Sequence, residues 1–447
     1  MPPIPNPSQR CASLKPSLFS SLSLLAKEKG AVNLGQGIPN WPPPPFVLQA
    51  LQGVLSSGPG DASGGLMQGS GATSSGDVLC RIPSSAAAAP QGRAAFERGA
   101  LVHQYALPNG VAELRQEVAT QLVPELGPDA STFNADDNVL VTNGCQEGIR
   151  LSLETCLDPG DTCVVIEPHF DTYVPDARLA GALVTGVPLH HTGDSSAVDP
   201  WYLDLDELAQ AFEADTPKVF FLNNPHNPTG HVFTDDELSG IAQLCRRHNV
   251  IAITDEIYDR IIFSDSPAPF RRLASYPGMA NRTLTLSSFS KTGSTTGWKV
   301  GWAVGPKHLV NAMTMMSMYT AYAIASPLQY AVADALRAAR ELDYYTHLSA
   351  EYQLRRDLLC GILRDAGYEV CVPGGAYFAM TRHTEPGFND VSFCYDLIER
   401  RGVAAIPASW LTTNSAFPSS FVRWSFCKTE DVLVEARRRL VGPAQGE

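Results

Sequence analysis

Residues 287–302 read SSFSKTGSTTGWKVGW. This stretch places Lys291 among hydroxyl side chains, three glycines and two tryptophans. The stretch is too polar for a buried strand, and its glycines disfavour a helix because glycine loses the most backbone freedom on folding. We therefore expect a loop whose lysine acts together with groups that other parts of the chain supply.

Length and composition limit the class of protein. A chain of 447 residues is too long for one simple core and predicts a large domain with a smaller one. Its 44% apolar and 18% charged residues fit an ordinary globular protein. The formal charge of -13 argues against nucleic acid or an anionic membrane as a partner.

Cysteine spacing and hydropathy predict a cytoplasmic protein. None of the ten cysteines forms a CxxC pair, so we expect free thiols and no metal. No run reaches the roughly 18 apolar residues of a membrane span, and the proline-rich N-terminus lacks the pattern of a secretory signal.

Beyond residue 97, short β-branched runs alternate with helical patterns, one of which starts at Thr234. This alternation predicts an α/β fold with a mostly parallel central sheet flanked by helices on both faces. The runs that we interpret as buried strands are VLVTNG (139–144), TCVVIEP (162–168), KVFFLNNP (218–225), VIAITDEIY (250–258) and TLTLSSFS (283–290).

We predict three segments along the chain. Residues 1–48 form an N-terminal arm and part of the small domain, 49–306 the large domain, and 307–447 a small α+β domain. A block rich in Gly, Ser and Ala at 58–97 has little to bury and is interpreted as a flexible insertion. The small domain is expected to contain helices at 307–320 and 327–365, then strands in YEVCVP, AYFAMTR and FVRWSF.

Polar side chains follow the ends of the predicted strands, where parallel sheets bind ligands. They are Asn223, Asn227, Asp255, Tyr258, Ser288 and Lys291. A lysine that forms an imine needs an aldehyde cofactor with an electron sink, and pyridoxal 5'-phosphate supplies both.

Three groups of the sequence meet the needs of that cofactor. Asp255 ends a hydrophobic strand, where a buried carboxylate requires a cation such as a pyridinium. The turn TNGCQEG (142–148) opens a helix and offers N–H donors to the phosphate, which Ser288 and Lys299 can complete. Phe170 offers a flat ring face.

The stretch SFSKTGSTTGWKVGW resembles the lysine signature of class I/II aminotransferases, which are pyridoxal-phosphate enzymes of fold type I. It is most similar to the kynurenine aminotransferase branch, which includes glutamine transaminase K and cysteine-conjugate β-lyase. Several blocks in order are far more specific than one. The others are NLGQGIPNWPPPPF (33–46), HQYALPNG (103–110), IEPHFDTYVP (166–175), NNPHNPTG (223–230), TDEIYDRIIF (254–263) and FVRWSF (421–426).

The resemblance implies a role for each matching residue. Lys291 forms the Schiff base and relays the proton, Asp255 pairs with the pyridine nitrogen, and Tyr258 completes the catalytic group. The implied cofactor-binding residues are Gly144, Cys145, Gln146, Phe170, Asn227, Asp255, Tyr258, Ser288, Lys291 and Lys299, with Tyr105 from a second subunit. The implied substrate-binding residues are Arg423, which clamps the carboxylate, and Gly37, Asn223, Phe19 and Tyr322. A shared site makes a homodimer part of the prediction.

Each residue alone has a simpler interpretation. Arg423 fits the solvent face of an edge strand, Phe170 and Tyr258 fit core aromatics, and Asp255 fits a strand-end cap. The ordered blocks together favour the site.

The chain departs from the branch at positions that face substrate. Phe19 stands where the family often has Trp, Gln146 where it often has Tyr, and Tyr322 with Ala323 where a Phe-His pair is common. An apolar pocket separates side chains that differ by a methylene by only about 1–3 kcal/mol, so we expect broad specificity.

The expected activity is that of an EC 2.6.1 transaminase. It moves an amino group from an aromatic or neutral amino acid, of the kynurenine, phenylalanine, glutamine or methionine type, to a 2-oxo acid. A cysteine-conjugate β-lyase using the same residues is the alternative. A cofactor-binding sensor domain of a transcription regulator would need a DNA-binding module, for which neither terminus has the length or charge.

Overall fold

The computed structural model describes residues 18–56, 101–414 and 417–442. The predicted insertion at 58–97 therefore lies outside the described residues. No helix of the described part is long and apolar enough to cross a membrane. The eight cysteines within that part are all buried and free.

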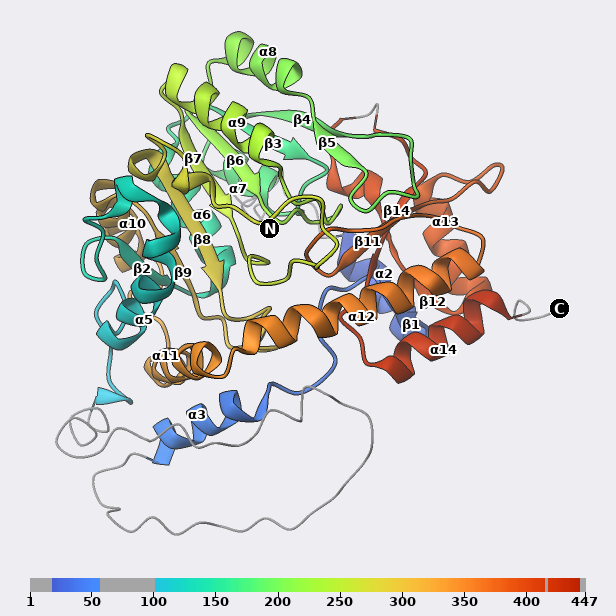
Figure 1. Cartoon of the computed structure of the whole chain (residues 1–447), viewed down its shortest axis with the longest axis horizontal. Helices are drawn as coiled ribbons and strands as arrows, with labels where there is room; N and C mark the ends of the chain where they lie inside the picture. Colours follow the sequence, from blue (N-terminus) through green and yellow to red (C-terminus); the bar gives the residue numbers. More distant parts are fainter. Residues whose placement is uncertain (1–17, 57–100, 415–416, 443–447) are drawn as a thin grey trace, which may run out of the picture.

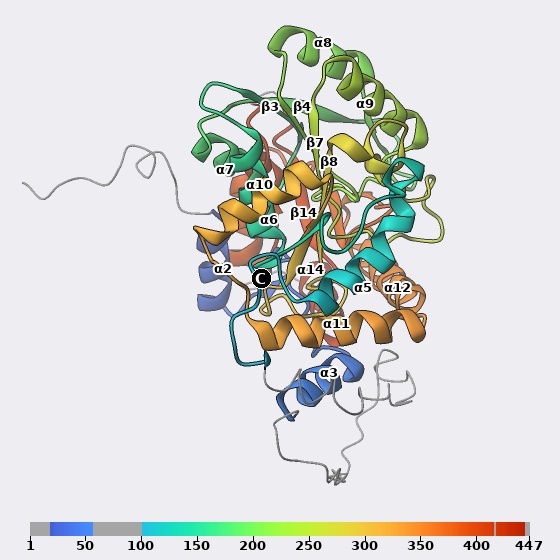
Figure 2. The same ribbon diagram turned by 90° about the vertical axis from the view of Figure 1, so that its left-hand side faces the viewer.

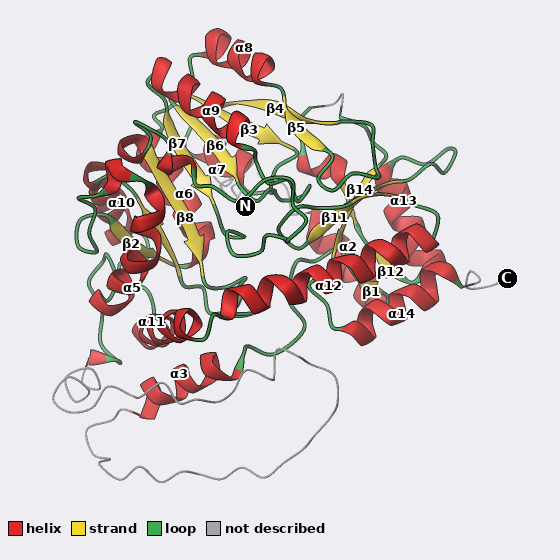
Figure 3. Ribbon diagram, viewed as in Figure 1, coloured by secondary structure: helices red, strands yellow, loops and turns green. Residues whose placement is uncertain are grey.

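An eight-stranded sheet forms the centre of the larger layer (Figures 1 and 3). Strands β3, β4, β6, β7 and β8 pair in parallel, while β9 and β5 pair antiparallel at the two sides. The five predicted strands are confirmed, and β4, β5 and β9 are additional. In spatial order the strands are β2 (Val139–Thr142), β9 (Gly301–Val304), β8 (Thr283–Ser288), β7 (Ile251–Asp255), β6 (Val219–Asn223), β3 (Thr162–Glu167), β4 (Leu183–His191) and β5 (Trp201–Leu203).

Both faces of this sheet are covered by helices, as the unbroken apolar runs predict. Along β6, Phe220 and Leu222 pack into the cluster that contains α8 and α9, while Phe221 packs into the cluster with α6, α7 and α10. Helix α3 lies along α11 in both views (Figures 1 and 2). The helices of this layer are α3 (Pro45–Ser56), α5 (Ala112–Leu122), α6 (Gly144–Cys156), α7 (Tyr173–Leu179), α8 (Leu205–Asp215), α9 (Asp235–Arg247), α10 (Lys307–Met318) and α11 (Ser326–Glu341).

Local signals set the helix ends. Thr234 caps α9 in a reciprocal capping box with Glu237, whose side chain accepts a hydrogen bond from the Thr234 N–H at 2.7 Å.

The sequence predicts one helix over 327–365, which is wrong. The chain turns at Asp343, which adopts a left-handed φ of 50°, and a second helix, α12 (Tyr344–Asp365), begins there.

A four-stranded antiparallel sheet forms the smaller layer. Its strands, in spatial order, are β10 (Glu369–Cys371), β11 (Phe378–Arg382), β14 (Phe421–Ser425) and β13 (Ile406–Pro407). Helices α12, α13 (Asp390–Asp396) and α14 (Glu430–Val441) accompany it. The domain boundary at residue 306 stays a prediction, since α10 and α11 pack on the helices of the larger layer.

The N-terminal segment joins this smaller layer. Strand β1 (Val32–Asn33) pairs in parallel with β12 (Val403–Ala404). Helix α2 (Leu18–Glu28) packs Leu22 and Ala26 into the same apolar cluster as β11 and β14. Residues near the two ends of the sequence are thereby brought to the same side of the molecule.

A buried histidine ties the loop after β6 to the rest of the larger layer. His231 Nδ1 lies 2.8 Å from Asp199 Oδ1, and its Nε2 lies 3.2 Å from Glu237 Oε2. Burial disfavours the charged ring, but the charges of Asp199 and Glu237 and their hydrogen bonds outweigh it and raise the pKa of His231 to about 10. The imidazolium is therefore a permanent cross-link at neutral pH.

This pKa predicts a pH-dependent stability. Because the folded pKa lies above the ordinary 6.5, the stabilisation is complete below about pH 6.5 and is lost as pH rises through about 10. We expect the melting temperature of the apoprotein to fall between those pH values, and His231→Gln to flatten that fall. His308→Gln, at an exposed histidine, is the control and should keep the wild-type slope. Equal slopes for His231→Gln and wild type would contradict the ion-pair interpretation.

Candidate active site

The polar residues predicted at the strand ends do meet at one edge of the large sheet. Asn223 and Asp255 are partners in the register of β6 and β7, and Ser288 faces Gly301 across β8 and β9. A cavity of about 160 Å³ opens beside them. It is lined by Gly144, Cys145, Gln146, Ile149, Phe170, Tyr173, Asn227, Asp255, Ile257, Tyr258, Ser290, Lys291, Thr296 and Lys299.

Asp255 is a buried carboxylate whose two oxygens both accept hydrogen bonds. Tyr173 OH donates to Oδ2 at 2.6 Å, and the Ile257 N–H donates to Oδ1 at 3.2 Å. Burial raises the pKa of Asp255, and the hydrogen bond from Tyr173 opposes that rise. No ion pair between described residues reaches Asp255, which lines the cavity.

Lys291 lies in the turn between β8 and β9, which has neither helix nor strand, as its composition predicts. Its Nζ is 3.4 Å from the carbonyl oxygen of Gly37 and 5.6 Å from the ring centre of Tyr377. Burial lowers the pKa of Lys291. A larger fraction of the amine is therefore unprotonated and nucleophilic than for an exposed lysine.

The start of α6 lies beside Lys299 in the cavity wall. Gly144 has a φ of 72°, and a Cβ built on it would lie 3.2 Å from Lys299 Nζ. A Cβ on Gly301 would lie 2.7 Å from the Cys145 nitrogen, so glycine is needed for β9 to approach the helix end. Free N–H groups, the helix dipole and an ammonium group together suit a phosphate.

Arg423 lies on β14, an inner strand between β11 and β13, and it is buried. The interpretation as a solvent-facing edge residue is therefore wrong. Its Nη1 donates to Asn227 Oδ1 and its Nη2 to the Gly35 carbonyl, both at 2.9 Å. The guanidinium carbon is 4.2 Å from the ring centre of Phe378 and 5.1 Å from that of Phe19.

One nitrogen of Arg423 is left without a partner. Its Nε is buried and has no partner within the described part of the chain. Burial lowers the pKa of Arg423 to about 10, so it is still cationic at neutral pH. A buried cation with a spare donor suits a carboxylate ligand.

Three predicted residues are placed differently from the simplest expectation. Asn223 donates from Nδ2 to the Asp255 carbonyl at 2.8 Å and accepts from the Asn227 N–H at 2.6 Å, so its amide braces the loop. Ser288 is not in the cavity wall, and its Oγ lies 2.5 Å from that of Ser290, which is. Gly37 is not in the cavity wall either, and its carbonyl oxygen accepts from Lys291 Nζ at 3.4 Å and from Tyr377 OH at 2.7 Å.

Tyr105 and Tyr322 do not reach the cavity of their own chain. Their rings pack edge to face at 5.7 Å on the surface, where the residues are 88% and 47% exposed. Residues that sequence reasoning missed in the cavity wall are Ile149, Tyr173, Ile257, Ser290 and Thr296. All of these except Ile149 lie inside quoted blocks, which were the available signal: Tyr173 in IEPHFDTYVP, Ile257 in TDEIYDRIIF, and Ser290 and Thr296 in SFSKTGSTTGWKVGW.

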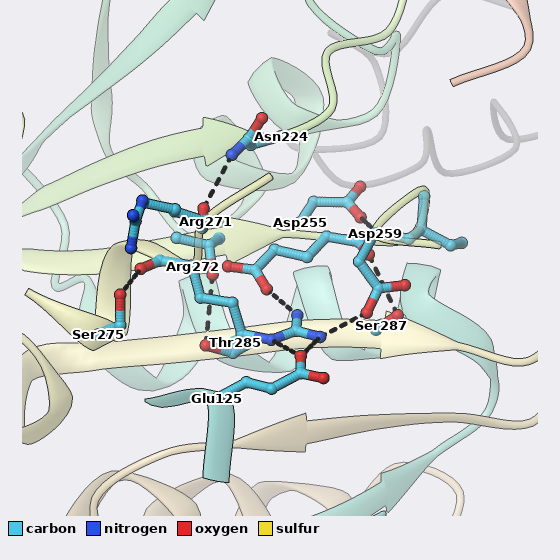
Figure 4. A network of polar contacts seen from close by, with 12 residues as sticks. Glu125, Asn224, Asp255, Asp259, Arg271, Arg272, Ser275, Thr285 and Ser287 are labelled. Atoms are coloured by element: carbon cyan, nitrogen blue, oxygen red, sulfur yellow. Dashed lines mark hydrogen bonds and ion pairs between the residues drawn. The ribbon is translucent and has the colours of Figure 1, made fainter. Parts of the chain in front are cut away.

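An ion network anchors the segment that follows Asp255 (Figure 4). Arg272 donates to Glu125 and Asp259, each at 2.6 Å, and to Glu256. Burial raises the pKa of Glu256 to about 7, and the Arg272 charge opposes that rise. One buried guanidinium thus holds carboxylates from both ends of the turn that positions Asp255.

The strand order and the position of the lysine turn define the class: a pyridoxal-phosphate-dependent transferase of fold type I. Sequence comparison then gives the family. The profile "Aminotransferase class I and II" matches residues 68–440, and the chain belongs to that family. Its members convert amino acids and 2-oxo acids, and they use pyridoxal 5'-phosphate.

Individual relatives divide between two named activities. A probable N-succinyldiaminopimelate aminotransferase of Mycobacterium tuberculosis is 34% identical, covering 95% of each chain. A kynurenine–oxoglutarate transaminase of Dictyostelium discoideum is 31% identical, covering 97% of this chain and 96% of its own. The solved N-succinyldiaminopimelate aminotransferase of M. tuberculosis superposes with a TM-score of 0.81 at 33% identity, over 98% and 99% of the two chains.

Substituting Arg272 tests how much the ion network contributes to the free energy of unfolding. Arg272→Leu leaves several carboxylates buried without their cation, and we expect a loss of about 3–5 kcal/mol in the free energy of unfolding, measured in urea. The neighbouring Arg271→Leu is the control, since its side chain is 56% exposed and should change stability by less than about 0.5 kcal/mol. Similar losses for both variants would refute a special role for the network.

Proposed function

We propose that this chain transfers the amino group of an aromatic or neutral L-amino acid to a 2-oxo acid by a ping-pong mechanism through Lys291. The observation that carries the proposal is that a part-buried amine, Lys291, and a buried carboxylate, Asp255, line one cavity. When bound, pyridoxal 5'-phosphate supplies an aldehyde and an electron sink.

The residues of the cavity fit that cofactor. Asp255, with no ion pair from described residues, would face the pyridine nitrogen and hold its proton. Gly144 and Cys145, at the start of α6, and Lys299 would hold the phosphate. Asn227 and Tyr258 would donate to the ring oxygen, with Phe170 against the ring face.

Lys291 moves the proton of the reaction. Its pKa, lowered by burial, lets Nζ accept a proton from the substrate Cα and return it to the other side of the transferred group. The Gly37 carbonyl at 3.4 Å fixes the direction of the side chain. Thr292 and Thr295 of the same turn are buried, which limits the access of water to this transfer.

Arg423 supports the choice of substrate. Its spare Nε and its bond to Asn227 place it to hold the α-carboxylate beside the cofactor. The rings of Phe19 and Phe378 near the guanidinium favour an aromatic or neutral side chain. Lys428, the next cation along the chain, is already bonded to the Gln36 and Ile38 carbonyls.

The apolar surroundings of Arg423 argue against N-succinyldiaminopimelate as the donor, which is the substrate in the name of one relative. A second carboxylate on the donor would need a second cation, and the cavity wall of the described chain offers Lys299, which the phosphate engages. We rank the kynurenine type of donor first for this reason.

We also propose a homodimer with shared sites. Tyr105, Tyr319 and Tyr322 are exposed together with Leu101 and Leu107. Exposed apolar residues in such number indicate a covered surface. In the dimer Tyr105 and Tyr322 would enter the partner's cavity.

Substituting Lys291 tests the central assignment. Lys291→Ala should lose the covalent link to the cofactor and lower kcat by at least about 10²-fold, because general acid–base catalysis supplies about that factor. Borohydride reduction of the wild-type holoenzyme should label Lys291, as read by peptide mass spectrometry. Lys307→Ala, at an exposed lysine, should keep both label and activity. A labelled Lys291→Ala protein would refute the assignment.

The donor is identified by half-reactions. We expect the visible absorbance of the holoenzyme to bleach with kynurenine, phenylalanine, glutamine or methionine, and less with N-succinyldiaminopimelate. A faster bleach with the succinylated donor would reverse the ranking. With a cysteine conjugate and no oxo acid, more than one equivalent of pyruvate without bleaching would favour the β-lyase alternative.

A further inference from the structure

Tyr173, to which no role is assigned above, is hydrogen-bonded to the Asp255 carboxylate in the cavity. Tyr173 OH donates to Asp255 Oδ2 at 2.6 Å, and the Cys145 thiol donates to Oδ1 at 3.4 Å. The three residues come from the first turn of α7, the first turn of α6 and the end of β7. Their side chains thus converge from separate elements on one carboxylate.

Packing fixes the hydroxyl of Tyr173. Its ring lies 4.2 Å from that of Phe221 and meets Phe170 edge to face at 5.8 Å, and the residue is buried. The hydroxyl therefore cannot turn away from Asp255 without opening the core. Phe170 is also the ring proposed to face the cofactor, so Tyr173 supports two parts of the same pocket.

The Tyr173 hydroxyl keeps its proton and therefore donates a hydrogen bond to Asp255. Burial, followed by the charge of Asp255, raises the pKa of the Tyr173 phenol well above its usual value. The same two effects raise the pKa of the Cys145 thiol. Both groups keep their protons in the working range of pH and present them to Asp255, which stabilises the ionised carboxylate.

We propose that Tyr173, with the thiol of Cys145, is a positioning residue that keeps Asp255 ionised and weakly basic, so that the shared proton stays on the ring nitrogen of the cofactor. The inference rests on the proposed place of Asp255 opposite that nitrogen. A carboxylate that already accepts two side-chain donors competes less well for a third proton. The ring is then kept cationic, and its withdrawal of electrons is strongest.

The test is a pH titration of the visible absorbance of the full-length holoenzyme. That absorbance reports the proton on the cofactor-linked nitrogen of Lys291, which a cationic ring makes more acidic. Tyr173→Phe should raise the titration midpoint by about one pH unit, a tenfold change in the proton equilibrium. It should also lower kcat more than it changes KM, because the effect lies in the chemical step.

Tyr276→Phe is the matched control. Tyr276 also donates to a carboxylate at 2.6 Å, that of Asp235, at a part-exposed site away from the cavity. It should titrate and turn over as wild type. A wild-type midpoint in Tyr173→Phe would overturn the inference and leave Tyr173 a packing residue.

Two further variants keep the result interpretable. If Tyr173→Phe does not fold, Cys145→Ala should raise the midpoint while Cys145→Ser, which keeps a donor, should not. Equal midpoints in these two would then overturn the inference. Asp255→Asn distinguishes failure of the proposed cofactor site from failure of the role of Tyr173. An unchanged spectrum in Asp255→Asn would refute the cofactor site itself. A changed spectrum in Asp255→Asn together with a wild-type midpoint in Tyr173→Phe would refute only the role of Tyr173.

Discussion

Burial of the Asp255 carboxylate is the constraint on which the site depends. A charge at the end of a fully covered strand is costly unless hydrogen bonds and a cation compensate it. The protein supplies the hydrogen bonds, and no ion pair from the described residues supplies the cation. The carboxylate can therefore accept a cationic ring as its partner, and the surrounding turns hold it in place.

The same constraint explains why rigid supports surround a small cavity. Arg272 fastens the turn after Asp255, and Asn223 fastens the loop of the neighbouring strand to the Asp255 carbonyl. His231 links that loop to the rest of the layer. Each support uses a charged or amide side chain that is itself paired within the protein, so the supports hold the elements around the cavity in place.

Much of this could be predicted from the sequence, for physical reasons. Buried parallel strands are unbroken apolar runs, so five strands and the polar residues at their ends were readable. Strand β4 was not, because Gly186, Pro188 and two histidines interrupt its pattern. The turn at Asp343 depends on tertiary packing rather than a breaker residue. The bond between Tyr173 and Asp255 joins elements 82 residues apart, and no local pattern records such a contact.

The packing of Phe19 against Arg423 has a consequence for how the protein matures. One side chain comes from the first described helix and the other from the last strand, and they meet 5.1 Å apart. Contacts between such distant positions form late because loop closure opposes them. The surroundings of the Arg423 guanidinium are therefore complete only when helix α2 has joined strand β14 in the smaller layer.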